Sequence, residues 1–206
     1  MLAIELSTFG WMALTGLHAG QHIDRACDAT GVLGADAAAL GERLRALVRD
    51  APDDGDALVA ELAGFIEPRL QPLNPRHEVL IARVTEWLYA SFDPQLADLK
   101  LATGYSVRQL QRLVERYFGT GPKQLARKYR ALRVAGLLLS GESGEEQVAA
   151  LRNLFYDQSH MIREMRHFVG RTPLKFGKGG SPVLSAVTEL RNYRELRPDL
   201  ARNADD

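Results

Sequence analysis

The sequence predicts an all-α protein, and three observations support that prediction. Apolar residues recur at helical spacing in successive segments between residues 36 and 168. The order helix, turn, capped helix, glycine-x-x-proline occurs twice, over residues 95–122 and 147–173. A single apolar face over residues 123–140 predicts one long helix between the two copies. The second half of the chain is therefore expected to be two similar helical subdomains joined by that helix.

The first copy is centred on residues 105–118. One face of the predicted helix is apolar and comprises Leu110, Leu113, Val114 and Tyr117. The opposite face is polar and comprises Arg108, Gln111, Arg112 and Glu115. Gly104 suits a tight turn with a positive φ, and Ser106 is a good N-cap residue. This pattern is typical of a helix-turn-helix, whose second helix reads a DNA major groove, but an ordinary hairpin with a solvated charged face has it too.

The second copy favours the DNA-binding interpretation. Asp157 is positioned to cap a helix over residues 158–168. Its inward residues are Met161, Met165 and Phe168, and its outward residues are Ser159, Ile162, Arg163 and Arg166. The closing segment Gly170–Pro173 matches Gly119–Pro122 of the first copy. Two copies of the helix-turn-helix pattern, each with arginines on its outer face, are expected of a protein that binds duplex DNA at two places.

The charge distribution agrees with that expectation. The net charge is zero, but residues 1–99 hold 7 basic and 15 acidic side chains, whereas residues 100–178 hold 15 basic and 6 acidic ones. A net charge of +9 over one block is the electrostatic footprint of a polyanion-binding unit. A single cysteine, Cys27, excludes an internal disulfide framework, and there is neither a secretory signal nor an apolar run long enough to span a membrane. We expect a cytoplasmic protein.

The first 74 residues are expected to form a small helical region. Residues 1–6 could be a short strand, and residues 10–29 are weakly helical with Trp11, Leu14 and Leu17 buried. His18 and His22 are spaced i, i+4, but a zinc site needs further convergent ligands, so a partly buried helix surface is the preferred interpretation. Helices are predicted over residues 36–48 and 57–70, with Asp54 or Asp56 as the cap of the second.

Two prolines in residues 71–76 predict a linker, after which a helix is expected over residues 77–91. The predicted domains are residues 1–74, residues 75–178, and a tail over 179–206 that is helical from about 181 to 196. The sequence contains no Walker loop and no GxSxG motif, and it shows no residue that would activate Cys27. Neither an enzyme nor a cofactor is therefore expected.

Two stretches carry a resemblance to a known family. GYSVRQLQRLVERYFGTGPKQLARKYRALR and FYDQSHMIREMRHFVGRTPLKF resemble the two halves of the DNA-binding domain of AraC/XylS-type bacterial transcription regulators. The resemblance covers about residues 77–178. It implies a seven-helix unit that places two recognition helices in successive major-groove segments, about 34 Å apart. The partners that it implies are promoter DNA and RNA polymerase, with the chain acting as an activator.

The resemblance also implies the DNA-contacting residues. The candidates for reading bases are Arg108, Gln111 and Arg112 in the first helix, and Ser159, Ile162 and Arg163 in the second. Arginine can bind guanine and glutamine can bind adenine through paired hydrogen bonds. Ser106, Gln158 and His160 are better candidates for phosphate contacts or helix starts. The predicted DNA-binding set is completed by Gln109, Arg116 and Arg166. For His160, packing at the turn is an equally good alternative.

Lys100 and Leu154 depart from the family pattern, because small residues are usual at both positions. These departures support one alternative function, an interaction module that no longer binds DNA and titrates other regulators. Only about 75 residues precede the DNA-binding region, which suggests a regulator that lacks its sensor barrel. The predicted N-terminal helices could form a homodimer through Leu40, Leu44 and Leu47, although core packing is the favoured role of that face.

Overall fold

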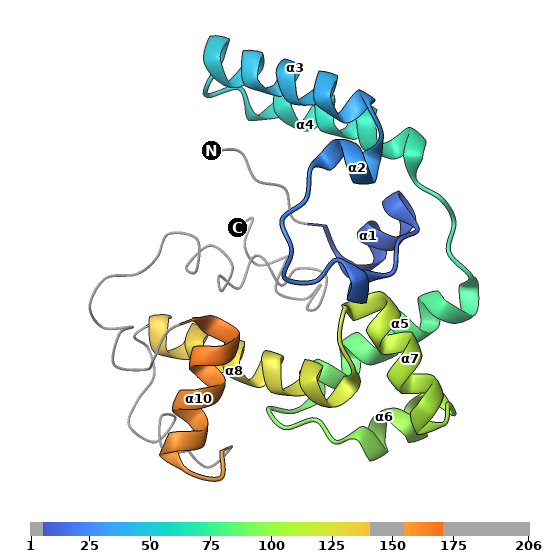
Figure 1. The fold of residues 1–206 in the computed structure, drawn as a ribbon, viewed down its shortest axis with the longest axis vertical. Coiled ribbons are helices and arrows are strands. Elements are labelled where there is room, and N and C mark those ends of the chain that lie inside the picture. The colour runs from blue at the N-terminus through green and yellow to red at the C-terminus, as the bar shows by residue number, and fades with distance from the viewer. Residues whose placement is uncertain (1–5, 141–154, 171–206) are drawn as a thin grey trace, which may run out of the picture. The chain divides into compact units, whose positions relative to one another are not determined.

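The computed structural model describes residues 6–140 and 155–170, and within these residues the protein is all helical (Figure 1). Contacts divide the chain into two compact units. Unit 1 contains the described residues up to Ile81 together with Leu113–Thr120. Unit 2 contains Ala82–Arg112 and the described residues from Gly121 onward. The all-α prediction is confirmed for the described part of the chain, whereas the division at residue 74 stays a prediction.

Unit 1 begins with three short helices rather than with one weakly helical stretch. Helix α1 spans Thr8–Thr15, the 3-10 helix η1 spans Ala19–Gln21, and α2 spans Ala29–Leu33. The continuous helix expected over residues 10–29 was therefore wrong. Gly16 ends α1 in the left-handed conformation, with φ +65°, and its N–H donates to the Met12 carbonyl. A helix cannot continue through such a residue.

The burial expected in this region was also only partly right. Trp11, Leu14 and Leu17 are half-buried, while Met12 and Ala13 form the buried face of α1. His18 caps η1, because its Nδ1 accepts a hydrogen bond of 3.1 Å from the Gly20 N–H. The described residues contain no cluster of three or more histidine, cysteine or acidic side chains that could hold a metal ion.

A helical hairpin follows, formed by α3 over Asp36–Asp50 and α4 over Gly55–Ile66. Asp54 caps α4 by accepting a hydrogen bond from the Ala57 N–H at 2.9 Å. The helix was expected to reach residue 70, but it ends at Ile66, and residues 67–69 form the 3-10 helix η2, which contains a proline at its start. Prolines favour the first turn of a new helix rather than the interior of an existing one.

The two hairpin helices bury a small core against each other. Its buried members are Ala37, Leu40 and Phe65, and Leu44 packs against them. The face that was considered for dimerisation is therefore largely used inside the hairpin. Dimer formation itself stays a prediction.

Helices α5 and α7 cross the division between the units. Helix α5 spans Pro75–Ala90 and α7 spans Val107–Phe118. In unit 1, the Tyr117 hydroxyl is hydrogen-bonded to His77 Nδ1, which joins the end of α7 to the beginning of α5. Gly119 ends α7 with φ +83°, and the side chain of Ile23 packs directly against it.

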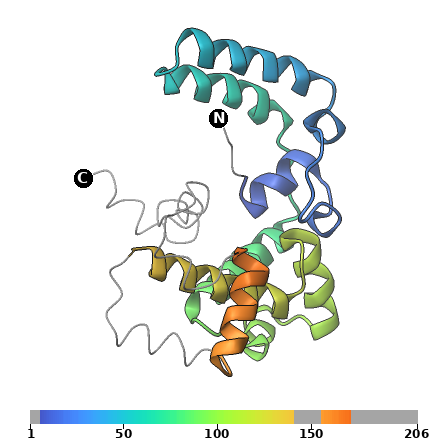
Figure 2. The same ribbon diagram turned by 60° about the vertical axis from the view of Figure 1, so that its left-hand side comes forward.

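Unit 2 contains the rest of α5 and α7, α6 over Leu96–Thr103, α8 over Pro122–Ser140 and α10 over Gln158–Val169. The 19 residues of α8 extend about 28 Å at ~1.5 Å per residue. Helix α10 packs across α8 in both views of the ribbon (Figures 1 and 2). Unit 2 thus contains the predicted long helix with a capped helix held against it.

Several predictions fall outside the described residues. These are the strand at residues 1–6, the helix at 147–153, the turn at Leu154 and the helical tail. Among the described residues, no helix combines the length and the apolar character that crossing a membrane requires.

Candidate nucleic-acid interface

The turn between α6 and α7 has the local geometry that its sequence predicts. Gly104 adopts φ +69°, and its N–H donates to the Lys100 carbonyl at 2.9 Å. Ser106 Oγ accepts a hydrogen bond from the Gln109 N–H at 3.3 Å, and Gln109 Oε1 accepts one from the Ser106 N–H at 2.9 Å. This reciprocal arrangement is a capping box, so the side chains of Ser106 and Gln109 are engaged in starting α7.

Lys100 does not disturb this turn. Its side chain is exposed, while the neighbouring Leu99 is fully buried. A long side chain at position 100 therefore extends into solvent and does not crowd the approach of α6 to α7. The turn at Gly104 therefore keeps its predicted geometry with lysine at position 100.

The two faces of α7 are as predicted. Its apolar residues are buried, namely Leu110, Leu113, Val114 and Tyr117. Arg108, Gln111 and Arg112 are exposed and all lie in unit 2. Within the described part of the chain, neither of the two arginines forms an ion pair or a hydrogen bond.

Gln111 behaves differently from its two neighbours. Its carboxamide occupies the space directly over Gly121, where a Cβ atom would stand if residue 121 were not glycine. The amide therefore covers the backbone just ahead of α8. Reading a base with Gln111 would require a rotation of this side chain.

The second candidate recognition helix, α10, begins as predicted. Asp157 Oδ1 accepts a hydrogen bond from the His160 N–H at 2.6 Å, which makes Asp157 its N-cap. Met161 and Met165 are buried, and Phe168 is half-buried. The outer residues Gln158, Ser159, Arg163 and Arg166 are exposed, whereas Ile162 is half-buried. In the described residues, Arg163 and Arg166 have no ion-pair partner.

His160 has the packing role that was one of its two expected alternatives. Its ring is half-buried and stands edge-on to Phe155, with centroids 6.0 Å apart. Its Nε2 lies 3.0 Å from Glu164 Oε1. The imidazole therefore contacts the inner side of α10 and does not extend from the outer face.

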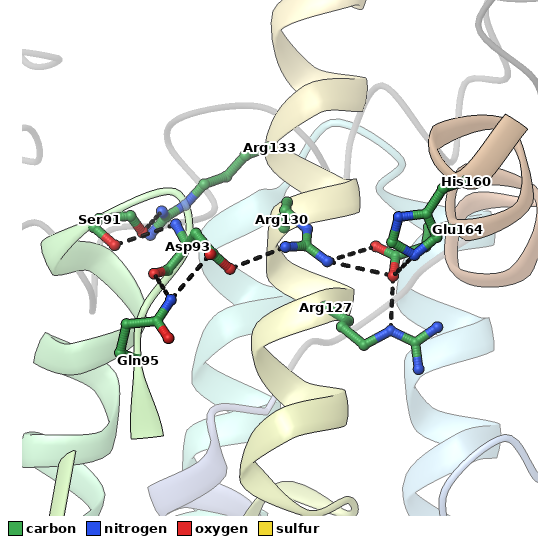
Figure 3. A network of polar contacts seen from close by, with 8 residues as sticks. All are labelled: Ser91, Asp93, Gln95, Arg127, Arg130, Arg133, His160 and Glu164. Carbon is green, nitrogen blue, oxygen red and sulfur yellow. Dashed lines mark hydrogen bonds and ion pairs between the residues drawn. The ribbon is translucent and has the colours of Figure 1, made fainter. Parts of the chain in front are cut away.

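Glu164 is the residue that the sequence analysis missed. It lies on the buried face of α10, and only 1% of its side chain is exposed. Arg127 Nε donates to its carboxylate at 2.7 Å, and Arg130 Nη2 donates at 3.1 Å (Figure 3). An acidic residue beside Met165 in an otherwise apolar stripe was the available signal, because a buried carboxylate needs a charged partner.

Opposing effects act on the ionisation of Glu164. Burial by itself would raise the pKa of this carboxyl. The hydrogen bonds and the positive charges of Arg127 and Arg130 together outweigh burial and lower the pKa below its usual value. The carboxylate is therefore ionised at neutral pH and binds both arginines.

The same face of α8 also reaches the segment between α5 and α6. Arg130 Nη1 donates to Asp93 Oδ1 at 2.9 Å. Arg133 donates to the Ser91 carbonyl at 2.6 Å and also to the Leu88 carbonyl. The Trp87 indole N–H donates to the Gln95 carbonyl at 2.8 Å, which closes this segment on α5. Helix α8 thus carries arginines that contact α10 and the segment between α5 and α6.

Comparisons with known proteins agree with this geometry. Residues 101–179 match the family model of a helix-turn-helix domain, of the AraC type. No curated protein and no solved structure matches the chain. The matched range contains α7, α8 and α10, and with them the exposed arginines of α7 and α10. The chain therefore contains an AraC-like helix-turn-helix domain, the DNA-binding module of transcription regulators.

Proposed function

We propose that the protein is a sequence-specific transcription regulator that inserts α7 and α10 into successive major-groove segments of one duplex. The observation that carries this proposal is the pair of exposed faces on α7 and α10. On each helix an apolar stripe is buried, and two exposed arginines have no ion-pair partner in the described residues. Four guanidinium groups without an ion-pair partner in the described part of the chain are expected where phosphates and base edges are the partners.

The proposed base-reading residues are the outward ones nearest the helix starts. They are Arg108, Gln111 and Arg112 on α7, and Ser159, Ile162 and Arg163 on α10. Recognition helices contact base edges through their N-terminal residues. Arg163 is the strongest candidate for guanine, since it is exposed and lies in the second turn of α10. Ile162, half-buried at the edge of that face, suits a thymine methyl group.

The other predicted contacts divide into two groups. Arg116, Arg166 and Gln158 are exposed and suit the phosphate backbone. Ser106, Gln109 and His160 are engaged inside the protein, in the cap of α7 and against Glu164. We propose that these three residues support the two helices rather than contact bases. Promoter DNA, with RNA polymerase bound nearby, is the proposed setting for an activator of this type.

The test is selection of bound duplexes from a random DNA pool by the purified chain, at two salt concentrations. A two-part motif whose centres lie about one helical turn apart is expected. A single half-motif would mean that only one helix reads bases. Absence of enrichment at both salt concentrations would contradict sequence-specific binding and favour a module that titrates other regulators.

A further inference from the structure

One guanidinium group contacts two separate segments of unit 2, the segment before α6 and helix α10. Arg130 Nη1 donates to Asp93 Oδ1 at 2.9 Å, and Arg130 Nη2 donates to Glu164 Oε2 at 3.1 Å and to Oε1 at 3.3 Å (Figure 3). Only 11% of the Arg130 side chain is exposed. The two terminal nitrogens thus bind different carboxylates, which come from different parts of the chain.

Each carboxylate also has a second contact within its own part of the chain. Asp93 stands in the short segment before α6, and Gln95 Nε2 donates to its Oδ2 at 2.9 Å. Glu164 is buried on the inner face of α10, where Arg127 and His160 also contact it. Arg130 therefore joins the beginning of the first helix-turn-helix to the recognition helix of the second.

The chemistry of arginine makes this bridge selective. A guanidinium is planar, and its donors point in fixed directions, so two acceptors on opposite nitrogens are held at a defined separation. A lysine ammonium at the end of a flexible chain is a single point charge and does not hold two carboxylates in one plane. Arg127, by contrast, contacts Glu164 but neither Asp93 nor its segment in the described residues.

We propose that Arg130 is a positioning residue that sets the orientation of α10 relative to α6, and thereby the spacing between half-motifs that the protein accepts on DNA. The first part of the proposal concerns the protein alone. The second part rests on the proposed function, because it requires both recognition helices to read bases. The two parts are tested by separate measurements.

The first measurement is the distance between two spin labels in the DNA-free chain, by pulsed electron resonance. The labels are attached after Ala97→Cys on α6 and Tyr156→Cys just before α10, with Cys27→Ser removing the exposed native thiol. We expect a narrow distance distribution for the chain with Arg130 and a broad one after Arg130→Lys. Asp93→Ala is expected to broaden it too, and this variant leaves the contacts of Arg130 with Glu164 in place.

The matched control is Glu86→Ala. Glu86 is an exposed carboxylate of unit 2 that pairs with Arg83 inside helix α5. Its substitution removes an ion pair but leaves the contacts of Arg130 with Asp93 and Glu164 intact. The distribution should stay narrow in this control. A narrow distribution in Arg130→Lys and Asp93→Ala, or equal broadening in Glu86→Ala, would overturn the proposal.

The second measurement is the affinity for duplexes in which the spacing of the selected half-motifs is changed by one base pair. The affinity penalty for altered spacing should shrink about fivefold in Asp93→Ala, with affinity for a single half-motif unchanged. An unchanged penalty in a variant with a broadened distance distribution would overturn the second part. If the unaltered chain selects no motif, the proposed function fails, while the distance measurement still decides whether Arg130 positions α10.

Discussion

At the scale of single residues, Glu164 shows how a charge is stabilised on the buried face of α10, a candidate recognition helix. The carboxylate is almost fully buried and is surrounded by Arg127, Arg130 and His160. Its charge is compensated by hydrogen-bonded arginines, which is the condition for keeping an ionised group away from water. If the negative charge of Glu164 is removed, Arg127 and Arg130 on α8 lose the carboxylate that compensates their positive charges.

Glu164→Gln is expected to lower the free energy of unfolding by about 3 kcal/mol at neutral pH, because one partner of a buried ion pair is removed. The folded-state pKa of Glu164 lies below its unfolded value, so its stabilising contribution is present above the unfolded pKa and is lost as the pH falls through the folded pKa. The difference between wild type and variant should therefore shrink in acid. Urea unfolding at a series of pH values measures it.

The control for this measurement is Glu86→Gln, which removes the charge of an exposed carboxylate that pairs with Arg83. That variant should lose much less stability, since exposed ion pairs contribute about 0–1 kcal/mol. A Glu164→Gln penalty that stays constant down to low pH would show that packing, rather than charge, explains the loss.

A second residue-scale prediction concerns Gly119. Its φ of +83° is unfavourable for other residues, and a Cβ atom there would lie 2.9 Å from Ile23 Cδ1. Gly119→Ala should destabilise the protein by more than the roughly 1 kcal/mol that left-handed backbone costs an alanine. Gly104→Ala is the matched control, because Gly104 has φ +69° and nothing lies within 4 Å of its Cβ position. Equal losses in thermal unfolding would contradict the contact with Ile23.

Arg163 provides the residue-scale test of base reading. Arg163→Ala should weaken binding to the selected sequence by about 1–3 kcal/mol and relax the preference at one base pair. Competition binding against single-base variants of the selected duplex measures both effects. Arg45→Ala, an exposed arginine of α3 outside the matched domain, serves as the control. Should Arg163→Ala weaken all sequences equally, Arg163 contacts phosphate and not a base.

At the scale of elements, both candidate recognition helices depend on an N-cap made by a short polar side chain. The α7 cap is the Ser106–Gln109 capping box, and the α10 cap is Asp157. A cap satisfies backbone N–H groups that have no partner within the helix. It also decides where the first turn begins, and hence which residues the N-terminal turn of the helix exposes.

Asp157→Ala should therefore destabilise α10 by about 1 kcal/mol, whereas Asp157→Asn should retain most of the cap. Amide hydrogen exchange of residues in the first turn of α10 reports this locally, and it should accelerate in the alanine variant only. If exchange accelerates equally in both variants, the negative charge at the helix N-terminus matters more than the hydrogen bond.

At the scale of the whole molecule, charge is separated along the chain. The block of residues 100–178 has a net charge of +9, while residues 1–99 have a net charge of −8. Binding driven by such a block releases counterions from DNA and therefore weakens steeply as salt is added. Affinity for a random duplex should fall about a thousandfold between about 50 and about 200 mM salt if six or more phosphates are contacted.

The same salt titration compares the contribution of the basic block, residues 100–178, to DNA binding with that of the acidic residues 1–99. Arg166→Gln should reduce the slope of log affinity against log salt by about 1, because one phosphate contact is lost. Arg43→Gln, in the acidic part and already paired with Glu61, should leave the slope unchanged. No detectable binding at low salt would contradict a DNA-binding role for the basic block.

The sequence by itself determined the elements whose stability is local. The apolar stripes of α7 and α10, the turn at Gly104 and the caps at Ser106 and Asp157 each depend on residues within a few positions of one another. Periodicity and capping preferences act over that range, and for that reason these predictions were confirmed. The split of residues 10–29 was missed because left-handed residues at Gly16 and Asp24 outweighed a weak helical pattern.

Only the tertiary structure decided which polar side chains are inside. Glu164 and Arg127 are 37 positions apart, as are Asp93 and Arg130, so no local pattern indicates their pairing. His160 lies only four positions from Glu164, on the same helix, but its packing role depends on the burial that α8 gives to Glu164. A charged residue can be buried only where distant segments bring it a partner, and that condition arises when α10 packs on α8.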